Sequence, residues 1–239
     1  MTSPTYNEYY LVPYNKYLIE TTGCSIYLNK QKIKIRRALI SVFDKTGIVG
    51  LAESLNQHGI EIISTGGTAK TLGDAGLLVK GISTYTGFPE IMDGRVKTIN
   101  PLVEGGILGL RDKHADDAKA NNIRWIDLVV CNLYPFSKII SQADCGLMMA
   151  MDNVDIGGPT MVRSAAKNVG WVTVVVDPQD YQSIIDELDE FVEISFETRK
   201  KLSAKAFGHT AQYDTIIHNY LKDEKFSSDL SLTLSLIHI

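Results

Sequence analysis

Residues 154–168 bring several chemically capable side chains together in one short segment. The Asp155 carboxylate comes just before a Gly-Gly-Pro sequence, whose glycines allow the backbone to approach a ligand closely. Pro159 suits the first turn of a helix, and in that helix Arg163 and Lys167, four residues apart, lie on one face. The pattern predicts a site for a small anionic ligand with a residue for proton transfer. A solvated helix after a tight turn is the alternative.

A glycine-rich loop, Ser-Thr-Gly-Gly-Thr, lies between an expected strand and an expected helix. Its hydroxyls, flexible glycines and helix-start N–H groups together favour phosphate binding. The residues expected to contact a phosphate are Ser64, Thr65, Gly66 and Gly67. An ordinary turn capped by Thr68 is the alternative, and the G-x-G-x-x-G spacing of a dinucleotide site is absent.

Two further loops carry cations. In the first, Lys45 is placed to reach a phosphate, whereas Asp44 is expected to cap the following helix. In the second, Arg95 and Lys97 stand two residues apart, so that both point to the same side of an extended segment. Two like charges side by side are unfavourable without an anion. The second loop therefore favours anion binding, with a solvated loop as the alternative.

Asn132 and Tyr134 follow a strand-like Asp-Leu-Val-Val-Cys run. An amide at this position can recognise an amide or a base edge, and a phenol can donate a hydrogen bond. Structural roles are equally common for both residue types. The five histidines show no metal-ligand spacing, so no metal site is expected.

The composition limits the classes of function. The chain has 239 residues, 44% hydrophobic and 22% charged, as in ordinary globular proteins. A net charge of −4 argues against general nucleic-acid binding. Three cysteines without metal spacing favour a reducing compartment, and we expect a cytoplasmic protein. We expect no membrane association, because the sequence shows no apolar run of about 18–20 residues. We expect no signal peptide, because the first 20 residues are tyrosine-rich and polar.

Between the two ends of the chain, apolar strands alternate with helices. Strands are expected at residues 37–43, 60–64, 77–82, 127–131 and 171–176. Helices are expected at residues 46–58, 68–75, 181–191 and 195–220. This alternation predicts an α/β fold with a mostly parallel sheet flanked by helices. Ligands of such sheets bind beyond the carboxyl ends of the strands, where the motifs above stand.

The motifs also occur in a specific order. The series is Ser-Val-Phe-Asp-Lys-Thr-Gly, Ser-Thr-Gly-Gly-Thr, Gly-Arg-Val-Lys-Thr, Cys-Asn-Leu-Tyr-Pro-Phe, Asp-Ile-Gly-Gly-Pro-Thr and Arg-Ser-Ala-Ala-Lys-Asn. From about Arg36 to about Leu221 the chain resembles the N-terminal IMP cyclohydrolase domain of the bifunctional AICAR transformylase/IMP cyclohydrolase family. The resemblance implies a methylglyoxal-synthase-like domain. It also implies the dehydrative ring closure of FAICAR to IMP, the last step of de novo purine biosynthesis.

The resemblance also assigns roles to individual residues. It places substrate contacts at Asp44, Lys45, Ser64, Thr65, Gly66, Gly67, Arg95, Lys97, Thr98, Asn132, Asp155 and Gly157. It implies catalytic roles for Lys97, Tyr134, Asp155 and Lys167, with Lys167 as proton donor or acceptor. In the expected chemistry Asp155 and Lys167 deprotonate the attacking amide, while Lys97 and Tyr134 stabilise the developing oxyanion. The sequence equally allows the two pairs to exchange roles.

The resemblance divides the chain into four parts. They are an atypical N-terminal extension (1–35), the cyclohydrolase domain (36–190), a helical linker toward a transformylase half (191–225) and an atypical tail (226–239). The folate site of the family lies in the transformylase half, so we expect no cofactor and no formyl transfer by this chain. The expected ligands are FAICAR and IMP. The family is dimeric, largely through the second half, so a homodimer is left open.

Three positions depart from the family pattern. Asn100 and Glu104 stand where histidines are usual, and Phe43 stands where serine is usual. Three other functions remain open. One is an effector-binding module like the regulatory domain of carbamoyl phosphate synthetase, another is methylglyoxal synthase, and the third is an inactive truncated product. The joint presence of Lys97 and Tyr134 with the other catalytic positions argues against the first alternative. The specific segment after Asp155 argues against the second.

Overall fold

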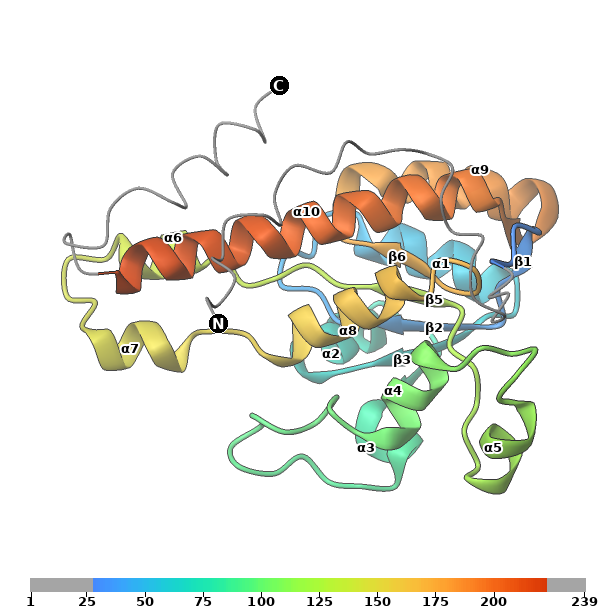
Figure 1. The fold of residues 1–239 in the computed structure, drawn as a ribbon, viewed down its shortest axis with the longest axis horizontal. Helices are drawn as coiled ribbons and strands as arrows, with labels where there is room; N and C mark the ends of the chain where they lie inside the picture. The colour runs from blue at the N-terminus through green and yellow to red at the C-terminus, as the bar shows by residue number, and fades with distance from the viewer. Residues whose placement is uncertain (1–27, 223–239) are drawn as a thin grey trace, which may run out of the picture.

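Five short parallel strands form the central sheet, in the order β4-β3-β2-β5-β6 (Figure 1). A computed structural model describes residues 28–222; residues 1–27 and 223–239 of the expected extension, linker and tail lie outside the described residues. The strands are β2 (Arg37–Ile40), β3 (Glu61–Ser64), β4 (Val79–Gly81), β5 (Leu128–Val130) and β6 (Thr173–Val175). Every neighbouring pair is parallel, which confirms the predicted sheet.

The strands are buried on both faces because their side chains alternate between two cores. Leu39, Ile63 and Val129 enter one core, and Ile40 and Ile62 enter the other. Helices α4 (Pro101–Leu108), α8 (Gly157–Lys167) and α10 (Phe196–Leu221) cover the first face. Helices α1 (Ile48–Gln57), α2 (Gly66–Asp74) and α9 (Tyr181–Phe191) contribute to the second core.

Short elements complete the described part. They are β1 (Ile33–Lys34), α3 (Ile82–Thr86), α5 (Ala115–Ala120), α6 (Phe136–Ile140), α7 (Leu147–Asp152), the 3-10 helix η1 (Pro178–Asp180) and β7 (Glu193–Ile194). β1 and β7 pair antiparallel in a separate two-stranded sheet. None of the helices within residues 28–222 has the length and apolarity needed to cross a bilayer.

The long predicted helices form for the expected reasons. In α1, Leu51 and Leu55 are fully buried at the spacing of one helix face. The chain then leaves α1 through Gly59, whose positive φ of 69° favours glycine. Ser195 caps α10 by accepting a hydrogen bond from the backbone N–H of Thr198 at 3.2 Å.

The packed core extends beyond residues 36–190. Ile33 and Ile35 are 6% and 1% exposed, so the end of the expected extension (1–35) packs into the core. Within the expected linker (191–225), α10 lies along α8, and the Ser203 hydroxyl donates to the Ala166 carbonyl at 2.6 Å (Figure 1). The boundaries at residues 35 and 190 are therefore not edges of the folded unit. Apolar residues at β1 and along α10 bury there because the sheet needs cover at that side.

Candidate active site

A cavity of about 630 Å³ opens beyond the carboxyl ends of β2, β3 and β5. Such positions are the usual ligand sites of open parallel sheets. Eleven of the fourteen predicted site residues line it: Lys45, Thr65, Gly66, Gly67, Arg95, Lys97, Thr98, Asn132, Tyr134, Asp155 and Gly157. The other three, Asp44, Ser64 and Lys167, lie elsewhere. The cavity thus joins motifs that are more than 100 residues apart in the sequence.

The start of α2 forms one wall of the cavity. The helix begins at Gly66, two residues earlier than the sequence predicted, and no side chain caps it. Its first N–H groups therefore remain available to an anion. A Cβ at Gly66 or Gly67 would meet no atom within 4 Å, which shows open space in front of the backbone.

The two hydroxyls that flank this glycine pair serve the protein itself. The Ser64 hydroxyl is fully buried and donates to the Ile40 carbonyl at 2.7 Å, tying β3 to β2. The Thr68 hydroxyl donates to the Val42 carbonyl at 2.9 Å instead of capping α2. The prediction of a ligand contact for Ser64 is therefore not supported by its orientation, because the last residue of a buried strand points into the core.

The start of α8 forms the opposite wall. Asp155 accepts a hydrogen bond from the Gly158 N–H at 2.9 Å, and its own N–H donates to the Tyr213 hydroxyl at 2.8 Å. A Cβ at Gly157 would lie 2.7 Å from the Thr98 hydroxyl, so glycine is required there by close approach. The Gly-Gly-Pro sequence is the first turn of α8 itself. Two helix N-termini, each with a partial positive charge, thus face one cavity.

The loop with Arg95 and Lys97 places both cations on the cavity wall, although it forms a turn closed by the Ile91–Val96 bridge and not the expected extended segment. Arg95 forms an ion pair with Asp152, and the Lys97 ammonium lies 4.0 Å from Glu90. The Arg95–Asp152 pair is exposed, and the Lys97–Glu90 pair is half-buried but long, so neither pair contributes much to stability. The two cations are therefore available to a ligand at small cost.

Asn132 holds the loop in front of it in place. Its side-chain oxygen accepts from the Phe43 and Asp44 N–H groups at 2.7 and 2.9 Å, and its amide donates to the Asp44 carbonyl at 3.1 Å. Phe43 in turn packs edge-on against Tyr134, with ring centroids 4.3 Å apart. Sequence reasoning missed this role of Phe43, because the contact joins residues that are 91 positions apart.

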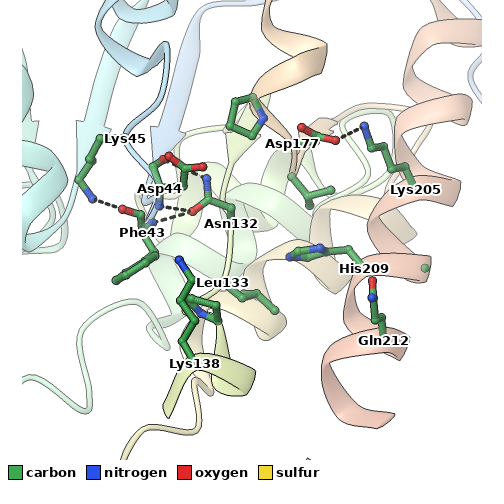
Figure 2. A pocket seen from close by; sticks show the side chains of 14 residues that line it. Phe43, Asp44, Lys45, Asn132, Leu133, Lys138, Asp177, Lys205, His209 and Gln212 are labelled. Atoms are coloured by element: carbon green, nitrogen blue, oxygen red, sulfur yellow. Dashed lines mark hydrogen bonds and ion pairs between the residues drawn. The ribbon is translucent and has the colours of Figure 1, made fainter. Parts of the chain in front are cut away.

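A second cavity of about 900 Å³ lies beside the first, and Figure 2 shows its lining. Phe43, Lys45 and Asn132 line both cavities, whereas Asp44 lines only this one. Asp44 accepts hydrogen bonds from the Thr46 hydroxyl and N–H at 2.7 and 2.9 Å, which lower the pKa of its carboxyl. These bonds close a turn before α1, whose N-cap is Gly47 without a side-chain cap, so the helix-capping role expected for Asp44 is wrong.

The far wall of the second cavity comes from α10. Lys205 forms ion pairs with Asp177 and Asp180 at 2.7 and 2.6 Å. Figure 2 shows the pair with Asp177, and it shows His209 on the same helix as Lys205. Burial lowers the pKa of His209, opposed in part by the Asp177 carboxylate. Burial likewise lowers the pKa of Lys45 on the wall that the two cavities share.

Lys167 is the last residue of α8 and lies outside both cavities. It follows Gly157 by ten residues, about 15 Å at the rise of an α-helix. Its exposed ammonium sits at the helix C-terminus, where the macrodipole favours a cation. Within residues 28–222 no group of three or more His, Cys, Asp or Glu could hold a metal ion.

The sheet order and the paired helix N-termini define a methylglyoxal-synthase-like α/β protein. Residues 47–160 match the family model for the MGS-like domain, and residues 165–238 match that for the AICARFT/IMPCHase bienzyme. The second match runs into the segment expected to be an atypical tail. A crystal structure of ForH superposes with a TM-score of 0.71 at 34% identity, covering 76% of this chain and 94% of that one.

Curated relatives agree with these matches. Over 204 residues the chain is 52% identical to the bifunctional purine biosynthesis protein PurH of Acetivibrio thermocellus, covering 84% of this chain and 40% of that protein. Over 191 residues it is 54% identical to PurH of Bacillus cereus (strain AH187), covering 79% and 37% respectively. The chain belongs to the PurH family and spans about two fifths of the length of these curated relatives.

Proposed function

We propose that this chain is an IMP cyclohydrolase, which closes FAICAR to IMP with loss of water. One observation carries the proposal: the N-termini of α2 and α8 face a single cavity that Lys97, Tyr134 and Asp155 also line. The cavity therefore combines an anion site with groups that can move protons. The match to the AICARFT/IMPCHase bienzyme and the PurH relatives support the same reaction.

The phosphate of the nucleotide binds at the start of α2. The uncapped N–H groups at Gly66 and Gly67 supply donors there, and the Thr65 hydroxyl, 2.9 Å from that of Ser41, lies at the same rim. Lys45 lines the cavity on the neighbouring loop. The volume of about 630 Å³ lies in the range of small-molecule sites.

Ring closure begins when the carboxamide nitrogen of FAICAR attacks the formyl carbon. A C–N bond forms, the formyl oxygen takes up the electron pair, and the nitrogen loses a proton. Asp155, which lies at the start of α8, accepts this proton, while Lys97 and Tyr134 donate hydrogen bonds to the formyl oxygen. The hydroxyl then takes up the proton that Asp155 holds and departs as water as the C–O bond breaks. The formylamino nitrogen gives its proton to the group that protonated the oxygen, Lys97 or Tyr134, and the C=N bond forms. In the alternative assignment the two sides exchange acid and base.

Much of the rate acceleration comes from holding the two reacting groups together. The attack is intramolecular, so a site that fixes the phosphate and the ring favours the reactive conformer. Dehydration changes no oxidation state, and the reaction itself calls for no redox cofactor.

Lys167 remains a predicted proton-transfer residue on the strength of the resemblance alone. Since a single chain holds it outside the cavity, the proposed reaction rests first on Lys97, Tyr134 and Asp155. If Lys167 transfers a proton in the reaction, it must reach the substrate of another copy of the chain, because it lies outside the cavity of its own.

An ultraviolet assay of FAICAR consumption tests the reaction, and titration calorimetry with IMP tests the site. We expect the full chain to bind IMP and to turn over FAICAR. Tyr134→Phe should retain IMP binding within about threefold and lose about 10²-fold or more in turnover, the size of one general-acid contribution. IMP binding without turnover would instead identify an effector-binding module. Release of phosphate from dihydroxyacetone phosphate would identify a methylglyoxal synthase.

A further inference from the structure

A second concentration of positive charge lies at the amino ends of β2 and β5, the opposite edge of the sheet from the candidate active site. A cavity of about 510 Å³ opens there. Its lining includes five cationic side chains and one carboxylate: Lys34, Arg36, Arg37, Arg111, Arg124 and Asp127. The elements that carry them are β1, the start of β2 and the loops before β5.

The carboxylate in this cavity is already fully engaged. One Asp127 oxygen accepts from the Arg36 and Arg37 N–H groups at 2.7 and 2.8 Å, and the other lies 2.6 Å from Arg111. Asp127 is 3% exposed, so these contacts are shielded from water. It therefore balances the Arg111 charge and fixes the backbone, but it forms no ion pair with the side chains of the other four cations.

A neighbouring carboxylate balances part of the remaining positive charge. Glu61 lies 2.6 Å from Arg37 and 3.2 Å from Arg124. Lys34 stands opposite Glu193 in the register of β1 and β7. The side chain of Arg36 makes no ion pair with any residue from 28 to 222.

The geometry keeps these like charges close together. Ile33 and Ile35 are buried, so Lys34 and Arg36 share the exposed face of the same extended segment. Burial lowers the pKa of Arg111, opposed by Asp127 and reinforced by the charges of Arg36 and Arg37. The Arg111 Nε atom is buried without a hydrogen-bond partner among the described residues. The exposed Arg36 guanidinium, which has no ion pair among residues 28–222, is the group best placed to bind an oxyanion in this cavity.

We propose that this basic cavity binds a multiply charged small oxyanion, a phosphate or diphosphate group, through Arg36 and the Arg37, Arg111 and Arg124 guanidinium groups. Its volume admits a group of this size, and guanidinium forks match phosphate oxygens in pairs. The chain's net charge of −4 disfavours an extended polyanion such as a nucleic acid. The site is separate from the proposed nucleotide cavity, with which it shares no lining residue.

Calorimetric titration of the full chain with inorganic diphosphate tests the proposal. To remove the contribution of the nucleotide cavity, the titration uses a background of saturating IMP, which occupies the proposed phosphate site at the start of α2. We expect one bound diphosphate in that background. Adding Arg36→Gln should weaken it about tenfold or more, the loss of one charge-assisted contact. Arg36→Lys, which keeps the charge, should recover part of the affinity.

Lys201→Gln is the matched control, because Lys201 is an exposed cation on α10 outside the cavity. It should leave the affinity for diphosphate unchanged. Arg36 makes no side-chain contact that the fold requires, so FAICAR turnover by Arg36→Gln in the native background reports on folding and should be unaltered. A parallel titration with a nucleoside diphosphate identifies the source of the bound group. A higher affinity for the nucleoside diphosphate than for inorganic diphosphate indicates a nucleotide, and equal affinities indicate a free diphosphate. Absence of diphosphate binding, or equal binding by Arg36→Gln and its parent, would overturn the proposal.

Discussion

The Phe43 ring packs edge-on against the Tyr134 ring, with centroids 4.3 Å apart and planes at 76°. Both rings line the proposed nucleotide cavity, and Asn132 fixes the Phe43 backbone from behind. The pair therefore sets where the Tyr134 hydroxyl lies. An aromatic contact thus supports the tyrosine ring at this position.

Phe43→Ala should lower the turnover of FAICAR about two- to tenfold. An edge-to-face aromatic pair is worth about 0.5–1.5 kcal/mol, and its loss frees the Tyr134 ring to leave the productive orientation. Steady-state kinetics should show the change in kcat, with KM nearly constant. Phe43→Tyr preserves the ring and serves as the control. Equal kcat for the alanine and tyrosine variants would show that the contact does not position Tyr134.

Two glycines at the site should respond differently to the same substitution. Gly157→Ala places a Cβ 2.7 Å from the Thr98 hydroxyl, so we expect a loss of about 1–3 kcal/mol in the free energy of unfolding. Gly67→Ala meets open space and should leave stability unchanged or slightly raised, while weakening IMP binding at the start of α2. Denaturant unfolding and IMP calorimetry on both variants provide the comparison. Undiminished IMP affinity in Gly67→Ala would exclude this helix start as the phosphate site.

Local sequence rules predicted the parts of the site that depend on local geometry. Arg95 and Lys97 both line the cavity, but the extended segment assumed for them is a turn closed by the Ile91–Val96 bridge, so strand alternation is not what brings them together. Parallel strands correctly placed the loops at one edge. Ser64 shows where such rules stop: its hydroxyl points into the core because it still belongs to a buried strand. Strand ends cannot be fixed to one residue by pattern alone.

Long-range contacts could not be predicted from the sequence. The hydrogen bonds from the Arg36 and Arg37 backbone to Asp127 join residues about 90 positions apart in the sequence, and no periodic pattern predicts them. The start of α2 lies two residues before the predicted one, since glycine has a low helix propensity, whereas α8 has Pro159 in its first turn as predicted. Both helices nevertheless begin at glycines, which keep the backbone open toward the cavity.

Glu104 should make stability depend on pH in a specific direction. Burial raises the pKa of this carboxyl, which accepts from the Ser164 hydroxyl at 2.7 Å, and its second oxygen is buried without a partner in the described chain. The folded state therefore holds the proton more tightly than the unfolded state. As pH rises from about 4.5, the unfolded chain ionises first and the folded state loses stability until Glu104 ionises as well.

Glu104→Gln removes this charge and keeps an acceptor for Ser164. The variant should therefore gain stability over the parent at pH 7.5, and the gain should vanish near pH 4, where both states are protonated. Urea unfolding at the two pH values measures the difference. A gain of the same size at both pH values would assign the effect to packing instead of to the carboxyl charge.

Arg199 should be one of the costliest residues to remove. It is fully buried on α10 and donates to the carbonyls of Val169, Ile194 and Gln31 at 2.9, 2.7 and 2.9 Å. Arg199→Ala leaves these acceptors without donors, and we expect a loss of about 3 kcal/mol or more in the free energy of unfolding. Lys200→Ala, at its exposed neighbour, should change stability by less than about 0.5 kcal/mol. A small loss for Arg199→Ala would mean that water replaces the guanidinium.

Lys167 provides the sharpest test of the reaction assigned by resemblance. Lys167→Ala should lower FAICAR turnover by about 10²–10⁴, as expected for a general acid or base. IMP binding should persist, because Lys167 does not line the cavity of the single chain.

Arg163→Ala is the matched control. It removes an exposed cation one turn earlier on α8, whose guanidinium lies 5.5 Å from the Phe207 ring. Since Arg163 has no proton-transfer role, its loss should leave turnover within about twofold. Unchanged turnover in Lys167→Ala would remove this lysine from the mechanism and leave the proton transfers to Lys97, Tyr134 and Asp155. An equal fall in both variants would instead indicate that the positive face of α8 acts through charge alone.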